Sequence, residues 1–351
     1  MVKLKRRRVS TRIGMVVGRI IRIAILAVLL IVLIFIQNNR VFNYRYIYES
    51  PVIPKTFVGY KIMQISDLSN KPMNTKELIF KENPDLVIFT GNYADEHGYY
   101  DASLNLIIKT AEKYNTMYVF GDQDEPYIDN MFSALSKSSA IYAEDDIFTV
   151  SAPEVKFDDF INKYIEASYL KDRDDPESTI SKYLEYTQEA LEEDQDKYIE
   201  IIGISDLDNE QNLNDYILDM IDLGENNFRV MIASQGQYIY KMAETPMNLV
   251  LTGNTYGIDR FNTGFSKGIY NVNGTTISLS GGIGKNPDGG SRIFNFPRVI
   301  TLTLSDGTIN NLNPLEKFLG KYITNVETRF DNDQGFKQGN TTYSNGKEVK
   351  D

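Results

Sequence analysis

"TMYVFGDQDE", residues 116–125, joins an apolar run to a polar loop, and this junction recurs along the chain. The run has the length and the aromatic and aliphatic side chains of a buried strand. It stops at Gly121, and the loop that follows holds Asp122, Gln123 and Asp124. The stretch therefore predicts a strand that ends at a loop with oxygen-bearing side chains.

Strands and helices alternate on both sides of this stretch. We expect strands at 59–66, 85–91, 198–205, 228–234 and 247–253, helices at 74–84, 103–114 and 213–223, and hairpins at 268–282 and 297–312. Strands that alternate with short helices indicate βαβ units and parallel sheets. The sequence therefore predicts an α/β fold.

Composition limits the classes of function. The chain has 351 residues, enough for one large or two ordinary domains, and no cysteine, which excludes disulfides and thiolate metal sites. Its net charge of −11 is unevenly distributed, since residues 1–40 carry nine Lys and Arg and no acid, which leaves −20 on the remainder. A domain this acidic repels nucleic acid, so we exclude that class of partner.

The basic start leads into an apolar stretch, Ile13 to Gln37, that is long enough to cross a membrane if two internal arginines extend to the headgroups. A cleaved signal peptide is the alternative. The residues after the stretch, "IFIQNNRVFNYR", lack a small-residue cleavage site, which favours an uncleaved anchor. The basic N-terminus then stays in the cytoplasm, and the rest of the chain is extracytoplasmic at the cell membrane.

We divide the chain by composition into four segments. They are a cytoplasmic basic segment and transmembrane helix at 1–37, a tether at 38–57, a main domain at 58–312, and a polar, partly disordered tail at 313–351. Residues 154–200 interrupt the main domain with 15 acids against six bases, and their apolar spacing predicts a helical insertion of two helices. In the tether, Phe42, Tyr44, Tyr46 and Tyr48 suggest an aromatic belt at the membrane surface.

Small polar residues follow five of the expected strands. In α/β folds, ligands bind beyond the carboxyl ends of the strands. The five loops carry Asp67, Ser69, Asn92, Asp95, Asp122, Gln123, Asp124, Ser234, Gln237, Asn254, Tyr256 and Asp259.

In order and spacing, these loops resemble the motifs of the calcineurin-like metallophosphoesterases, especially their membrane-associated bacterial branch. The resemblance runs from about Tyr60 to Leu304 without the insertion, and it includes "SKGIYNVNGTTISLSGGIG" and "SRIFNFPRVITLTL" near its end. It implies a metallophosphoesterase-type β-sandwich flanked by helices. It also implies a site in which two divalent metals activate a hydroxide that attacks phosphorus.

Most of the residues that this chemistry needs are replaced. Asp67 matches a metal ligand, and Asp124 matches the acid that partners the catalytic histidine. Asn92 stands where the family has the aspartate that bridges both metals, and Asp122 stands where it has an asparagine. Histidines of the family are replaced by Ser69, Gln123, Ser234, Asn254 and Tyr256.

These replacements remove charge and acid–base capacity. A neutral Asn92 does little to offset the repulsion between two nearby dications. Gln123 cannot donate a proton to a leaving group as imidazolium does. His97, the only histidine, matches no ligand position and is expected on a surface loop. Arg292 would contact a phosphate if the cleft binds one, and otherwise is a surface arginine.

Two hypotheses follow, and the sequence leaves enzymatic activity undecided between them. The first is a pseudoenzyme that needs no cofactor and acts as a binding or scaffold module for an unidentified protein or envelope partner. The alternative is an active phosphohydrolase for a phosphodiester or pyrophosphate. It would hold a single hard ion, Mg²⁺ or Ca²⁺, through the oxygens of Asp67, Asn92, Asp122 and Asn254.

Overall fold

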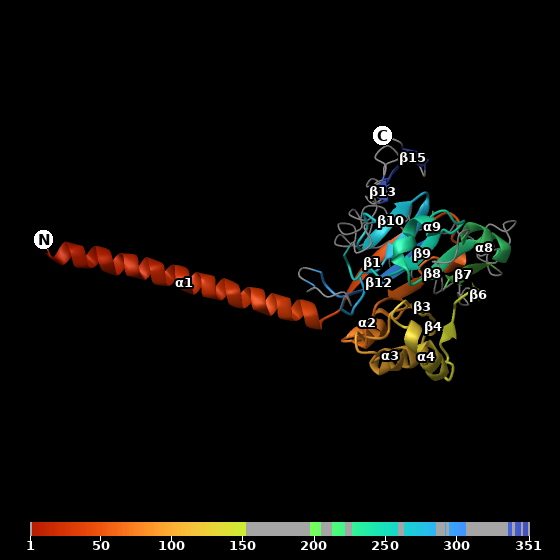
Figure 1. Cartoon of the computed structure of the whole chain (residues 1–351), viewed down its shortest axis with the longest axis horizontal. Coiled ribbons are helices and arrows are strands. Elements are labelled where there is room, and N and C mark those ends of the chain that lie inside the picture. Colours follow the sequence, from red (N-terminus) through yellow and green to blue (C-terminus); the bar gives the residue numbers. More distant parts are fainter. Residues whose placement is uncertain are drawn as a thin grey trace, which may run out of the picture.

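Two six-stranded sheets and a long N-terminal helix form most of the described chain (Figure 1). The structure is a computed structural model. It describes residues 2–151, 197–204, 213–221, 227–258, 263–285, 292, 295–306, 336–338, 341–344 and 347–349.

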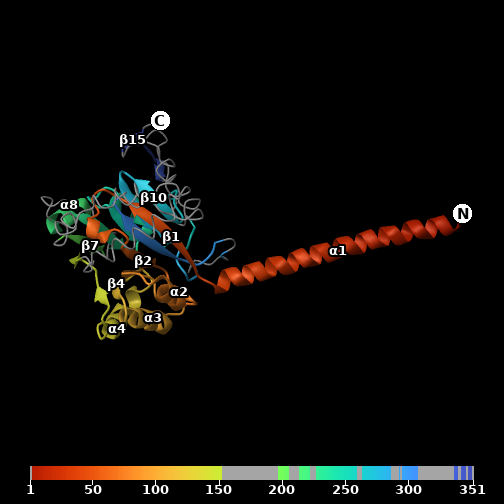
Figure 2. The ribbon, with the colours of Figure 1, turned by 180° about the vertical axis from the view of Figure 1, so that it is seen from behind.

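The N-terminal helix α1 (Val2–Asn39) projects away from the sheets (Figures 1 and 2). Its segment Gly14–Ile36 has 23 residues and a mean hydropathy of 2.9, and none of it is buried. The helix is therefore long and apolar enough to span a membrane, a property that it shares with signal sequences.

The first sheet has the order β1-β12-β2-β3-β4-β5. Strands β2 to β5 are parallel, β12 is antiparallel to β2, and β1 is parallel to β12. The central strands are almost wholly buried, as expected for parallel strands covered on both faces. The strands are β1 (Phe42–Glu49), β12 (Arg298–Ser305), β2 (Lys61–Ile65), β3 (Leu86–Thr90), β4 (Asn115–Val119) and β5 (Ile141–Tyr142).

The second sheet has the order β10-β11-β9-β8-β7-β6. Strands β11, β9, β8 and β7 are parallel, and β10 and β6 are antiparallel edge strands. The expected hairpin at 268–282 is present as β10 and β11. The strands are β10 (Gly268–Val272), β11 (Thr275–Leu279), β9 (Leu249–Thr252), β8 (Phe228–Ala233), β7 (Tyr198–Ile204) and β6 (Asp146–Ser151).

The two sheets face each other across one apolar core and are covered on their outer faces by helices. The central core joins buried side chains of both sheets, including Ile62, Val119, Ile201 and Val230. Helices α2 (Thr75–Glu82), α3 (Asp101–Ala111) and α4 (Ile128–Leu135) cover the first sheet, and α8 (Leu213–Met220) and α9 (Ile239–Met242) cover the second. Short 3-10 helices are η1 (Lys55–Phe57), η2 (Glu125–Tyr127) and η3 (Gly236–Tyr238). The expected α/β sandwich flanked by helices is confirmed.

The segment expected to be a tether contains a strand of the first sheet. Residues Phe42–Glu49 form β1, which pairs along its whole length with β12. Tyr46 and Tyr48 pack against the core between the sheets, so assigning them to an interfacial belt was wrong. The physical reason is that β12 offers an open sheet edge, which an eight-residue aromatic run pairs with readily.

Several expectations fall on residues outside the described ranges. They are most of the insertion at 154–200, Asp259 and the second arm of the 297–312 hairpin, whose first arm is β12. Of the tail at 313–351, the structure describes three short strands that form a separate sheet. They are β13 (Phe336–Gln338), β14 (Thr341–Ser344) and β15 (Lys347–Val349).

Candidate functional site

The predicted site residues come together at the carboxyl ends of β2, β3, β4 and β9. Backbone hydrogen bonds join the first two loops: the N–H of Asp67 donates to Gly91 O at 3.0 Å, and the N–H of Ser69 donates to Asn92 O at 3.0 Å. The N–H of Asn254 donates to both carboxylate oxygens of Asp67, at 3.1 and 3.2 Å, which ties the second sheet to the first.

The loops that carry the site share an uncommon backbone conformation. Five of the site residues have positive φ angles, a region that Asn and Asp tolerate better than other side chains. Those angles are 50° for Asp67, 44° for Ser69, 60° for Asn92, 63° for Asn254 and 51° for Tyr256. Such conformations cluster at functional sites, where the surrounding structure holds them.

Two glycines allow the loops to approach so closely. A Cβ atom at Gly121 would lie 2.3 Å from Asn92 Oδ1, and one at Gly282 would lie 2.4 Å from Asp67 Oδ2. Both distances are shorter than van der Waals contact. Any larger residue at either position would push an asparagine or aspartate of the site out of place.

Asp67 is a fully buried carboxylate whose oxygens are occupied by neutral donors. Besides the backbone of Asn254, its Oδ1 accepts a hydrogen bond from Asn92 Nδ2 at 2.9 Å. Burial raises the pKa of Asp67 to about 6, although these bonds and the charge of Arg292 favour the ionised form. The carboxyl group of Asp67 therefore holds its proton to a higher pH than an exposed aspartate does.

Side-chain amides link four of the predicted site residues to one another. Asn92 Nδ2 also donates to Asn254 Oδ1 at 3.2 Å, and Asn254 Nδ2 donates to Asp122 Oδ2 at 2.7 Å. Asn92 Oδ1 accepts from the backbone N–H of Gln123 at 3.2 Å. The result is a continuous network from Asp67 through Asn92 and Asn254 to Asp122, which we call the amide network.

Gln123 and Tyr256 form a second pair within the site. Gln123 Nε2 donates to the hydroxyl of Tyr256. Tyr256 is 1% exposed and is among the largest fully buried side chains of the described residues. It therefore fills space inside the site, and its backbone carbonyl accepts from Asn295 Nδ2 at 2.6 Å.

Asp124 has a structural role. Its two oxygens accept four backbone N–H bonds at 2.7–3.0 Å, from Gly121, Asn92, Tyr93 and Ala94. It is completely buried, and burial raises its pKa to about 7 against the effect of these bonds. The side chain thus holds the loops after β3 and β4 together.

Three further predicted residues, Arg292, Ser69 and Ser234, are not part of the amide network. Arg292 is buried, and its guanidinium donates to Gly282 O at 3.2 Å and Gly281 O at 2.8 Å. Burial lowers the pKa of Arg292 to about 10. Ser69 Oγ is buried and has no hydrogen-bond partner within the part of the chain that the structure describes. Ser234 is buried after β8, where no hydrogen bond joins it to the network among the described residues.

The residues present do not fit a dinuclear metal centre. No group of three or more His, Asp, Glu or Cys side chains that could hold a metal occurs among the residues that the structure describes. Between the carboxylates of Asp67 and Asp122 lie the amide nitrogens of Asn92 and Asn254, which donate hydrogen bonds and cannot bind a cation.

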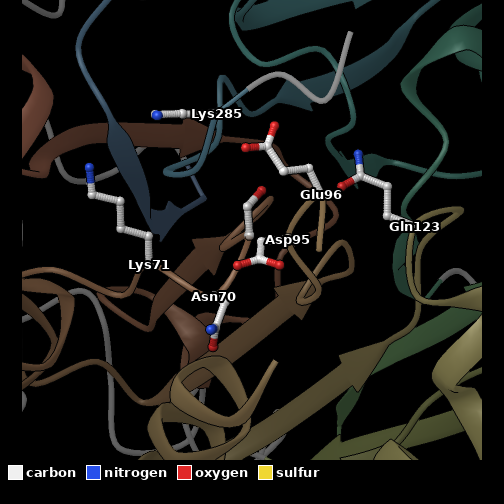
Figure 3. A pocket seen from close by; sticks show the side chains of 7 residues that line it. Asn70, Lys71, Asp95, Glu96, Gln123 and Lys285 are labelled. Atoms are coloured by element: carbon white, nitrogen blue, oxygen red, sulfur yellow. The ribbon is translucent and has the colours of Figure 1, made fainter. Parts of the chain in front are cut away.

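A cavity of about 270 Å³ opens beside Gln123 at the margin of the site (Figure 3). Four of its lining residues were not predicted from the sequence, although Asn70 and Lys71 directly follow Ser69 in the loop after β2. His97 lies outside this cavity, is exposed as expected, and has its Nε2 3.6 Å from Glu96 Oε1. The cavity is lined by Ser69, Asn70, Lys71, Asp95, Glu96, Gln123 and Lys285.

Comparisons with known proteins give only distant structural similarity. No family model and no curated protein matches the chain. The structure of the sulfate thiohydrolase SoxB of Thermus thermophilus, in complex with glycerol, aligns with 86% of this chain and 60% of that chain, at a TM-score of 0.36 and 9% identity. A second solved structure aligns with 62% of this chain and 89% of its own, at a TM-score of 0.33 and 12% identity. Similarity this low says nothing of activity.

Proposed function

We propose that the chain is a membrane-anchored binding protein built on a metallophosphoesterase-type sandwich without dinuclear metal catalysis. The observation that carries the proposal is the amide network: the residues that replace the metal ligands satisfy one another's hydrogen bonds. Asn254 illustrates it, since its amide accepts from Asn92 and donates to Asp122.

The charge balance of the site supports this proposal. Two divalent cations need an anionic bridge, because their repulsion at a separation of a few Å is large in a partly buried site. Asn92 occupies the bridging position and is neutral. Arg292 adds a positive charge that favours the ionised form of Asp67 and would repel a metal cation at that carboxylate.

The position of the family's general acid also supports it. Gln123 has no titratable proton, and its amide is bonded to the Tyr256 hydroxyl. The partner acid, Asp124, is engaged by four backbone N–H groups. Neither side chain is placed to protonate a leaving oxygen.

Anchoring and orientation complete the proposal. Helix α1 would hold the protein in the cell membrane, with the basic N-terminus in the cytoplasm and the sandwich outside. The partner would be a protein or an envelope component that meets the domain at the outer membrane surface.

The test combines metal analysis with activity measurements on the full chain, purified in mild detergent. We expect no stoichiometric Mn, Fe or Zn, and no turnover of phosphomonoester, phosphodiester or pyrophosphate substrates in Mg²⁺, Ca²⁺ or Mn²⁺. The matched variants are Asp67→Asn in the site and Asp129→Asn on the exposed face of α4. Metal-dependent turnover that is lost only in Asp67→Asn would overturn the proposal in favour of a phosphohydrolase with a single hard ion.

A further inference from the structure

The cavity beside the site is lined by side chains of both charges. Figure 3 shows Lys71 and Lys285 on one side and Glu96 on the other, with Asp95 between them. Its volume, about 270 Å³, lies just below the roughly 300–1,000 Å³ of pockets that hold drug-sized ligands. A small polar group that carries a positive and a negative charge matches this lining in size and charge.

Two further observations indicate an anion on the lysine side. Ser69 lines the cavity, and among the described residues its buried hydroxyl has no hydrogen-bond partner, although buried hydroxyls are normally bonded. The pKa of Lys71 is lowered by burial and then by the positive charges of Lys285 and Arg292. A phosphate group there would accept from the Ser69 hydroxyl and relieve the repulsion among the three cations.

The sheet topology places this cavity on the side of the domain that α1 reaches. Strand β12 is antiparallel to β2, and β1 is parallel to β12. Strand β1 therefore begins at the edge where β2 ends, the edge that carries the loop of Ser69 and Lys71. Figures 1 and 2 show α1 leaving the domain at the start of β1.

The connection between α1 and this edge is short and fixed. Only two residues separate the end of α1 at Asn39 from Phe42, the first residue of β1. Val41 is buried, and its N–H donates to Asn74 Oδ1 at 2.7 Å while its carbonyl accepts from Asn74 Nδ2 at 3.2 Å. The ring of Phe42 also contacts Phe296, with centroids 5.2 Å apart.

This connection limits how far the edge can lie from the bilayer. The apolar span ends at Ile36, and from there the chain reaches Phe42 in at most about 15 Å, given 1.5 Å per helical and about 3.4 Å per extended residue. The headgroup layer is itself roughly 5–8 Å thick on each side. The edge of the domain that carries the cavity therefore lies at the membrane surface when α1 spans the bilayer.

We propose that this cavity binds a phospholipid headgroup that carries a phosphate and a primary ammonium group, presented from the membrane to which α1 is anchored. The phosphate lies at Lys71, Lys285 and Ser69, and the ammonium group donates to the carboxylates of Asp95 and Glu96. The inference rests on the proposed function, because it requires α1 to anchor the chain.

The first experiment tests the ligand class with soluble probes. The full chain in detergent is titrated calorimetrically with O-phosphoethanolamine, inorganic phosphate and ethanolamine. We expect O-phosphoethanolamine to bind at least tenfold more tightly than phosphate.

Variants of the lining residues test each half of the cavity. Lys285→Ala should lower the affinity for O-phosphoethanolamine and for phosphate about fivefold, because each ligand loses a charge-assisted hydrogen bond. Glu96→Gln, an isosteric change at an exposed position, should weaken O-phosphoethanolamine alone, and Lys81→Ala on α2 is the matched control. Two results would overturn the headgroup assignment. One is equal affinity for O-phosphoethanolamine and phosphate, and the other is an unchanged affinity of Glu96→Gln for O-phosphoethanolamine.

The second experiment tests the source of the ligand. The full chain is placed in nanodiscs of phosphatidylglycerol alone or of phosphatidylglycerol with phosphatidylethanolamine, and O-phosphoethanolamine is added to each. We expect the apparent affinity for O-phosphoethanolamine to be at least fivefold weaker in the nanodiscs that contain phosphatidylethanolamine, because lipid headgroups already occupy the cavity there. The same affinity in both nanodiscs would overturn a membrane source and assign the cavity to a free solute.

Release of inorganic phosphate is followed in the same samples. Phosphate release would show that the protein is a catalyst and would overturn the proposed function, whereas the headgroup site would stand. Absence of both binding and release would overturn the headgroup site alone.

Discussion

The amide nitrogen of Asn92 lies 2.9 Å from Oδ1 of Asp67, so a neutral side chain donates a hydrogen bond to the buried carboxylate. Asn92 adopts a positive φ of 60°, which both Asn and Asp tolerate. An Asn92→Asp variant therefore alters the charge at this position without forcing a new backbone conformation. It places a second carboxylate beside the first and removes the donor.

We expect Asn92→Asp to destabilise the protein by about 2–4 kcal/mol at pH 8, because two buried like charges face each other and one hydrogen bond is lost. The loss should be smaller at pH 5, where one proton is shared by the pair. The measurement is the thermal midpoint of the full chain in detergent with a chelator present. Asn115→Asp, at the exposed start of β4, is the control. An unchanged midpoint at pH 8 would show that Asn92 does not donate to an ionised Asp67.

Stability should also depend on pH through Asp67. Its pKa in the folded protein is raised to about 6, against roughly 3.9 in an unfolded chain. The folded state therefore holds a proton that the unfolded state releases. This contribution is fully present below about pH 4 and is lost as the pH rises through 6, and it amounts to at most about 3 kcal/mol.

The Asp67→Asn variant isolates that contribution, since other titrating groups remain in both proteins. We expect the stability of the native chain to fall relative to the variant between pH 4.5 and pH 7.5, as measured by paired thermal unfolding curves. The opposite slope would mean that the hydrogen bonds from Asn92 and Asn254 outweigh burial and depress the pKa.

Asp124 should matter for folding in the absence of any substrate. Asp124→Ala leaves four buried backbone N–H groups without an acceptor, and each such group costs about 1–3 kcal/mol. We expect a loss of more than about 4 kcal/mol, and a smaller loss for Asp124→Asn, which keeps one acceptor oxygen. Asp129→Ala on α4 should stay within about 0.5 kcal/mol of the native chain. Equal midpoints for Asp124→Ala and Asp129→Ala would refute the structural role.

The sequence predicted the sandwich well because its signals are local. Apolar runs such as the one before Gly121 specify buried strands, and the polar residues after them mark the strand ends. The sequence could not reveal that β1 completes the first sheet, because that pairing joins residues about 250 positions apart along the chain. The aromatic run suited a membrane surface and a sheet edge equally.

The residues of the candidate site could be named from the sequence, but the hydrogen bonds among them could not. Position along the sequence places Asn92 and Asn254 at strand ends, whereas their mutual hydrogen bond depends on loops from both sheets. Gln123 and Tyr256 are likewise 133 residues apart. The charged lining of the cavity could not be predicted either, because Lys71 and Lys285 are far apart in the sequence and come together only in the folded chain.

The contact between Gln123 and Tyr256 predicts energetic coupling between these residues. In a double-mutant cycle of Gln123→Ala and Tyr256→Phe, we expect a coupling free energy of about 1 kcal/mol, because either change alone removes the same hydrogen bond. Unfolding midpoints of the four proteins supply the cycle. The control cycle pairs Gln123→Ala with Tyr99→Phe, an exposed tyrosine, and should be additive. Additivity in both cycles would mean that the contact contributes nothing to stability.

The bidentate contact between Asn74 and Val41 should fix the orientation of the domain relative to α1. Asn74→Ala removes both hydrogen bonds at the point where the chain leaves the helix. The chain has no cysteine, so single spin labels can be placed at Ile36→Cys on α1 and Lys109→Cys on α3 without further changes. We expect a narrow distance distribution between these labels in nanodiscs, and a clearly broader one in Asn74→Ala, with Asn130→Ala on the exposed face of α4 leaving it narrow. If Asn74→Ala keeps the narrow distribution, the sheet pairing of β1 alone holds the domain in place. If the distribution is broad even with Asn74 intact, the link is a hinge, and the cavity is not held at the membrane surface.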